Sequence, residues 1–199
     1  MEISPKQVME LRQRTNAGMM DCKKALIETG GDMEKAITIL REKGIATAAK
    51  RAGRATNQGF IAVYIHPGSK LAAMVEVNCE TDFVARNDKF QEFAKNVAMH
   101  IAAANPLSIS EEDIDQKIVE GEKEIYRQQA LNEGKKPEFV DKIVEGRVKK
   151  FYQENCLLDQ VYVRDEAKKL TIRDMLNDLI AAIGENIQVG RFTRFQVGA

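Results

Sequence analysis

The chain has 199 residues, of which 44% are apolar and 30% charged, the balance of a soluble globular protein with one domain or a small module beside a larger one. Its 30 Lys and Arg equal its 30 Asp and Glu, so the formal net charge of zero argues against a general electrostatic attraction to nucleic acid. Three cysteines without a CxxC pair argue against a disulfide framework and a structural zinc site, and no apolar run reaches the roughly 18 residues that a membrane span needs.

Residues 1–44 are predicted to form a compact module of three short helices. Ser4 and Gln7 can form a capping box at the start of the first helix, Asp32 can cap the third, and Gly44 is expected to end it. Apolar side chains recur at helical spacing, so one small core can close between the helices. The apolar positions are Val8, Leu11, Met19, Met20, Cys22, Ala25, Leu26, Ile27, Ala36, Ile37 and Leu40.

Residues 45–58 are interpreted as a basic connector with a helical start. Lys50, Arg51 and Arg54 supply its positive charge among small residues. These cations could touch RNA, although a solvated helix end is the simpler interpretation.

Residues 59–199 are predicted to form a larger core domain. Residues 60–65 and 71–77 are rich in residues that favour strands and are separated by a short turn, which predicts a β-hairpin. An amphipathic helix is predicted over 87–104. Apolar and polar residues alternate over 187–197, which predicts a last strand that joins the hairpin sheet.

Within this core domain, residues 110–155 are predicted to form a charged helical hairpin. Ser110 is expected to cap the first arm, residues 134–137 to form the turn, and a later helix to run from Thr171, its cap, to Gly184. A narrow apolar stripe on each arm suggests that the two arms pack mainly on each other and stand off the body. The stripes contain Ile114, Ile118 and Ile125 on the first arm and Phe139, Ile143, Val148, Phe151 and Tyr152 on the second.

The most informative segment is the polar connection Asn78 to Arg86, between the second strand and the next helix. At its centre Asp82 places a carboxylate beside the aromatic Phe83. An exposed aromatic on a short, anchored turn suits insertion into a partner's pocket, because ordering its two torsions costs little entropy. Alternatively, Phe83 and Val84 staple the following helix to the sheet, which is the simpler interpretation of the residues alone.

Met19 and Met20 present a similar choice at the start of the second helix. Adjacent helical positions point about 100° apart, so both cannot be central in one small core. One thioether can therefore face outward as a protein contact, while packing of both in or around the core is the alternative.

The sequence contains no motif typical of catalysis, such as a phosphate-binding glycine loop or a nucleophile elbow. We therefore expect no enzyme, no catalytic residues, no cofactor and no metal. Cys79 could serve as a nucleophile, but a buried small apolar residue is the simpler interpretation. The first residues, Met1 to Pro5, lack the features of a signal peptide, so we expect a cytoplasmic protein.

Two long strings stand out: Leu11 to Leu26 (LRQRTNAGMMDCKKAL) and Glu76 to Arg86 (EVNCETDFVAR). They resemble the two signature segments of bacterial elongation factor Ts, the nucleotide-exchange factor for the GTPase elongation factor Tu. Ile183 to Ile187 also resembles the family's C-terminal segment, and the likeness spans nearly the whole chain. One departure is Asn16, where the family usually has glycine; asparagine tolerates a left-handed turn conformation better than most residues.

The resemblance implies an α+β fold. Its N-terminal part is a ubiquitin-associated-like three-helix module, and its core is a small antiparallel three-stranded sheet packed by helices with a projecting helical hairpin. The chain is similar to the short form of the family, which has one core unit and is associated with dimers. We therefore expect a homodimer within a two-plus-two complex with elongation factor Tu, without direct contact to nucleic acid or membrane.

The resemblance also implies the contacts with the partner. Thr81, Asp82, Phe83 and Val84 match the segment that enters the GTPase beside its magnesium site, where Phe83 would wedge between partner side chains and Asp82 would help to anchor the turn. Disturbing the magnesium and phosphate site would promote GDP release during translation elongation. The residues that match contacts of the N-terminal module to a helix of the partner's nucleotide domain are Arg12, Met19, Met20 and Lys23.

Two rival functions follow from the residues alone. The small N-terminal module and the basic connector suggest a scaffold or RNA-binding protein, and Cys79 suggests a thiol enzyme. Acceleration of GDP release from elongation factor Tu would distinguish nucleotide exchange from both.

Overall fold

A computed structural model describes residues 3–15 and 17–198 of the chain, so the turn expected at Asn16 lies outside the described residues. The chain divides into two compact units. The first contains the residues up to Ala102 and those from Arg173 onward, and the second runs from Ala103 to Ile172. No helix in this described part combines the length and the hydropathy that a bilayer span requires.

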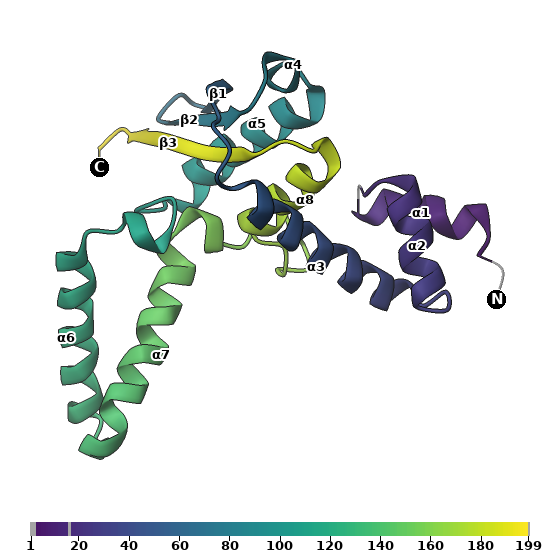
Figure 1. Ribbon diagram of the computed structural model, residues 1–199. Coiled ribbons are helices and arrows are strands. Elements are labelled where there is room, and N and C mark those ends of the chain that lie inside the picture. Colours follow the sequence, from purple (N-terminus) through teal and green to yellow (C-terminus); the bar gives the residue numbers. More distant parts are fainter. Residues whose placement is uncertain (1–2, 16, 199) are drawn as a thin grey trace. The chain divides into compact units, whose positions relative to one another are not determined.

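Three helices begin the first unit (Figure 1): α1 (Pro5–Thr15), α2 (Met19–Glu28) and α3 (Met33–Arg51). Both predicted caps are confirmed, because the N–H of Gln7 donates to Ser4 Oγ at 3.3 Å and the N–H of Lys35 donates to Asp32 Oδ1 at 3.1 Å. This arrangement is consistent with a ubiquitin-associated-like module. Its buried core contains Val8, Leu11, Cys22, Ala25, Leu26, Ala36 and Leu40.

The prediction that the third helix ends at Gly44 is wrong, because α3 continues for two further turns. Gly44 is buried inside the helix, where a Cβ would lie 3.8 Å from the Cβ of Ala181 in α8 (Ile172–Ile183). Beside this close approach, Arg41 of α3 donates to Asp174 Oδ1 from Nε at 3.1 Å and from Nη2 at 2.6 Å. The long helix therefore joins the N-terminal helices to α8.

The first unit also contains an antiparallel sheet with strand order β1-β2-β3, which confirms the predicted hairpin and its third strand. The strands are β1 (Gln58–Ile65), β2 (Leu71–Cys79) and β3 (Ile187–Gln196). Helix α5 (Asp88–Ala104) packs on one face of this sheet. There, Nε of Arg194 in β3 donates to the carbonyl of Ala102 in α5 at 3.0 Å. The side chains of Ala62 and Val75, which are paired in the sheet, are buried on this inner face.

The opposite face of the sheet is exposed and largely apolar. Val63 pairs with Met74, so their side chains lie side by side on this outer face. The apolar residues of the outer sheet face, each between 44% and 70% exposed, are Ile61, Val63, Ile65, Met74 and Phe195.

The second unit contains the predicted helical hairpin, with α6 (Gln116–Asn132) and α7 (Pro137–Asn155) as its arms. Ser110 does not cap the first arm as predicted. It forms a capping box with Asp113 in the short turn η1 (Glu111–Asp113), and Asp115 caps α6 by accepting from the N–H of Lys117 at 2.9 Å. A further short turn, η2 (Leu157–Asp159), follows the second arm.

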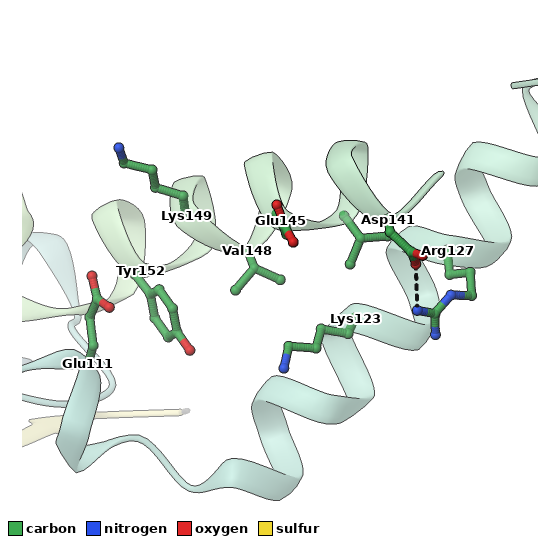
Figure 2. A pocket seen from close by; sticks show the side chains of 9 residues that line it. Glu111, Lys123, Arg127, Asp141, Glu145, Val148, Lys149 and Tyr152 are labelled. Carbon is green, nitrogen blue, oxygen red and sulfur yellow. Dashed lines mark hydrogen bonds and ion pairs between the residues drawn. The ribbon is translucent and has the colours of Figure 1, made fainter. Parts of the chain in front are cut away.

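The apolar stripe of the hairpin differs from the prediction, because Ile118, Ile125 and Phe139 are exposed. The groove between the arms has a volume of about 710 Å³, and in it Arg127 of α6 reaches Asp141 of α7 at 3.0 Å (Figure 2). The buried cluster of this unit contains Ile114, Val119, Ala130, Val140, Val144, Val148, Phe151 and Cys156.

Candidate partner-binding site

The candidate site is the turn after β2, where the short helix α4 (Asp82–Ala85) begins. Phe83 leaves 80% of its surface exposed, whereas the next residue, Val84, is buried with 9% exposed. Val84 therefore attaches the turn to the core, and Phe83 lies at the surface. The stapling role considered for both residues fits Val84 and is wrong for Phe83.

Thr81 fixes the start of α4 through its backbone and its side chain. Its N–H donates to Glu185 Oε2 at 3.0 Å, and its hydroxyl donates to Glu185 Oε1 at 2.6 Å. The same hydroxyl oxygen accepts from the N–H of Val84 at 3.4 Å, which is an N-cap contact. The carbonyl of Thr81 accepts from Cys79 Sγ at 3.2 Å. Thr81 is thus held from inside the protein.

Asp82 remains at the surface beside Phe83. Its Oδ2 lies 3.1 Å from Arg86 Nη2, and its side chain is 47% exposed. The N–H of Arg86 donates to the carbonyl of Asp82 at 3.2 Å. An exposed ion pair of this kind contributes little to stability.

A second carboxylate fixes the segment that precedes Thr81. Glu80 Oε1 accepts from the N–H of Asn186 at 2.6 Å and lies 3.4 Å from Arg54 Nη1. Asn186 is buried, and its Nδ2 donates to the carbonyl of Arg54 at 2.7 Å. Arg51 in turn donates to the carbonyl of Ile180 at 3.1 Å. Two cations of the predicted basic connector therefore contact this protein itself.

Cys79 is fully buried at the end of β2. Burial, together with the negative charge of Glu185, raises the pKa of its thiol to about 11. The side chain is therefore a neutral thiol near pH 7 and acts as a hydrogen-bond donor to Thr81. Neither its accessibility nor its pKa suits a nucleophile, so the structure does not favour a thiol enzyme. Among the residues that the structure describes, no three His, Cys, Asp or Glu side chains are grouped to hold a metal ion.

The predicted contact residues of the N-terminal module all lie at the surface of α1 and α2: Arg12, Met19, Met20 and Lys23. Met19 is 43% exposed and Met20 62%, so neither side chain is buried in the core. Ile27 was not predicted as a contact but is also exposed. Ile27 lies seven residues after Met20, which is close to two helical turns, so the two side chains share one face of α2. This spacing is visible in the sequence and could have identified Ile27 as a candidate contact.

Comparison with known proteins gives one consistent family. A family model described as elongation factor TS matches residues 6–172. The chain is 60% identical over 199 residues to elongation factor Ts of Nitratidesulfovibrio vulgaris. This match covers 100% of this chain and 98% of that relative. It is 60% identical over 196 residues to elongation factor Ts of a Thermoanaerobacter species, covering 98% and 95%. The relative from Desulfotalea psychrophila is 58% identical over 199 residues, with 100% of both chains covered.

Proposed function

The chain belongs to the elongation factor Ts family, and we propose that it promotes GDP release from elongation factor Tu by inserting Phe83 beside the partner's magnesium site. Membership of the family supports the exchange role in translation elongation. The observation that supports the mechanism is the 80% exposure of Phe83 on a turn whose backbone is already anchored.

The energetics of insertion favour an aromatic side chain on a fixed turn. Moving the ring of Phe83 from water into a partner's pocket contributes roughly 2–3 kcal/mol. Thr81 and Val84 already hold the backbone, so little further ordering accompanies binding. In this proposal Phe83 makes the central contact and Asp82 stabilises the turn at the partner's surface, while Thr81 and Val84 support them from inside.

The effect on GDP follows from linkage between the two ligands of the GTPase. A factor that binds the nucleotide-free partner more tightly than the GDP-bound one must weaken GDP binding by the same ratio. A magnesium ion at the partner's nucleotide site would offset the negative charge of the phosphates, so disturbing its surroundings would lower the affinity for GDP. In this proposal the exchange factor acts by binding alone, so the mechanism requires no chemical step, cofactor or nucleotide pocket on this chain.

The N-terminal module provides a second contact in this proposal. The contact would be made to a helix of the partner's nucleotide domain by two flexible thioethers, which lie between two cations along the sequence. The residues are Arg12, Met19, Met20 and Lys23. The exposure of both methionines supports this assignment.

We divide the chain by function into a module of residues 1–44, a connector of 45–58, and a core domain of 59–199 that includes the hairpin of 110–155. The buried cluster of the N-terminal helices supports the first boundary, because its last member along the chain is Leu40. The polar anchors that Arg51 and Arg54 make support the role of 45–58 as a connector attached to the core domain.

We also propose that the protein forms a homodimer within a two-plus-two complex, through the outer sheet face. A contiguous apolar surface of this kind is uncommon on a monomer. Two copies can cover it by packing sheet against sheet, which buries Val63 and Met74 of each copy. The proposed setting is the cytoplasm, without direct contact to nucleic acid or membrane.

Release of labelled GDP from purified elongation factor Tu, with and without this protein, tests the proposed function. We expect faster release with the protein, and less acceleration when free Mg²⁺ is raised, because excess Mg²⁺ opposes loss of the bound ion. An unchanged rate of release would contradict the exchange role. Binding to RNA with a steep salt dependence would then favour the scaffold or RNA-binding function.

A further inference from the structure

We propose that Glu185 is a positioning residue for Phe83, and this inference rests on the proposed exchange function. Its carboxylate uses both oxygens on one residue, Thr81, at 3.0 Å and 2.6 Å. The two residues are 104 positions apart, so this contact joins the segment after α8 directly to the start of α4.

The carboxylates of Glu80 and Glu185 form a reciprocal arrangement. Glu185 accepts the N–H of Thr81 at 3.0 Å, and Glu80, the residue before Thr81, accepts the N–H of Asn186, the residue after Glu185, at 2.6 Å. Each segment therefore binds the backbone of the other through a charged acceptor. We call these four residues the carboxylate clasp. Hydrogen bonds to an ionised acceptor are about twice as strong as neutral ones.

Helix α4 needs such support because it is only four residues long. A helix of this length does not hold its own conformation in water, so its geometry depends on what holds its ends. Glu185 also orients the hydroxyl of Thr81, whose oxygen then accepts the N–H of Val84 at 3.4 Å. The position of Glu185 thus sets the direction of the backbone on which Phe83 lies.

Glu185 itself lies on a short segment between two regular elements, α8 and β3. Gly184, with φ of 92°, ends α8 in the left-handed region that favours glycine, and β3 begins at Ile187. Between them, Asn186 is buried and donates to the carbonyl of Arg54 at 2.7 Å. A carboxylate held in this way can fix a neighbouring turn rather than follow its motion.

Two readouts separate this role from general stability. The chain has no tryptophan, so Phe83→Trp introduces a single reporter at the tip of the turn. Time-resolved anisotropy of that reporter measures the local mobility of the turn without any partner. The second readout is the maximal rate of GDP release from elongation factor Tu at saturating exchange factor, with Phe83 retained.

Glu185→Ala in the Phe83→Trp background is expected to give a larger amplitude of fast local motion, with unchanged overall tumbling. In the Phe83 background the same substitution removes both hydrogen bonds to Thr81 and is expected to lower the maximal release rate by at least tenfold, the ratio that about 1.4 kcal/mol implies. Glu185→Gln keeps the shape and the volume of the side chain. In each measurement it should lie between Glu185→Ala and the parent protein with Glu185, which is Phe83→Trp for the anisotropy and the wild type for GDP release.

Glu133→Ala is the matched control. Both oxygens of Glu133 also accept from one residue, Arg147, at 2.9 Å and 3.1 Å, but this pair lies in the hairpin. It should change neither readout. Equal anisotropy in Phe83→Trp alone and in Phe83→Trp combined with Glu185→Ala or Glu185→Gln would overturn the proposal, whatever the release assay shows. A wild type that fails to accelerate GDP release would refute the exchange function instead, and the anisotropy would still decide the role of Glu185.

Discussion

Phe83 and Val84 are neighbours in the chain with opposite environments, 80% exposed against 9%. Successive side chains on a helical turn diverge by about 100°, so burial of Val84 directs Phe83 away from the core. The valine anchors the turn, and the carboxylate of Glu185 fixes where that turn begins. One local geometry therefore accounts for both the rigidity and the exposure that an inserted aromatic needs.

The two exposed methionines of α2 give the first prediction. Met19→Ala combined with Met20→Ala should weaken complex formation with elongation factor Tu by about 2–3 kcal/mol, because two apolar contacts are lost. The free energy of unfolding should change by less than about 0.5 kcal/mol, since neither side chain is in the core. Calorimetric titration and urea unfolding measure the two quantities. Leu131→Ala, an exposed apolar residue of the hairpin, is the control, and equal affinities of all three proteins would exclude this contact.

The outer sheet face gives the second prediction. Val63→Asp should leave the protomer folded, because Val63 is exposed in the single chain. It should convert a dimer to monomers, since burying an unpaired carboxylate at the interface costs several kcal/mol. Sedimentation equilibrium reports the mass, with Val63→Thr as the mild control. A dimer that survives Val63→Asp would place the interface elsewhere.

The contact between α3 and α8 gives a prediction on pH. Burial, and then the neighbouring charge of Asp174, raise the pKa of Asp178 to about 6, while Arg41 acts in the opposite direction. Because this value is above the ordinary 3.8, the neutral form stabilises the folded state. That contribution is complete below about pH 4 and is lost as the pH rises through about 6.

Asp178→Asn keeps the neutral form at every pH. It should therefore exceed the wild type in unfolding free energy by about 1 kcal/mol at pH 7.5, after allowance for solvent screening, and by much less near pH 4. Urea unfolding at the two pH values measures the difference. If Asp178→Asn and the wild type differed in unfolding free energy by the same amount at both pH values, the titration of Asp178 would not contribute to the pH dependence of stability.

The buried thiol gives a further prediction. Cys79→Ser should retain the acceleration of GDP release, because a serine hydroxyl can still donate to the carbonyl of Thr81. Stability should fall by no more than about 1–2 kcal/mol, since a hydroxyl is less suited than a thiol to an apolar site. The GDP release assay measures the acceleration, and urea unfolding measures the stability. Loss of acceleration in a folded Cys79→Ser protein would revive a chemical role for the thiol.

Local features of the chain were predicted well because their causes are local. The strands follow from alternation and a short turn, and Ser4 and Asp32 cap helices through residues only three positions away. The exposure of Phe83 could not be decided in this way, because an aromatic next to a valine can take either position. Only the packing of Val84 against the folded core separates the two.

Features that depend on distant elements were missed. The spacing between Thr81 and Glu185 carries no periodic signal, so their contact is visible only in the folded chain. From the sequence alone, Gly44 is typical of a helix end. In the folded chain it lies against Ala181 of α8, which explains a glycine inside the helix. In the hairpin, Ile118 and Val119 are adjacent and either can begin a seven-residue stripe. The structure buries the smaller Val119 in the apolar cluster of this unit and leaves Ile118 exposed.

The insertion of Phe83 is tested most directly by the maximal rate of GDP release from elongation factor Tu with Phe83→Ala at saturating concentration. Phe139→Ala, which removes another exposed aromatic ring in the hairpin, is the matched control. We expect Phe83→Ala to slow release by roughly thirtyfold, the ratio that corresponds to about 2 kcal/mol, while the fold and the Phe139→Ala rate stay unchanged. A folded Phe83→Ala protein that releases GDP as fast as the wild type would contradict the mechanism.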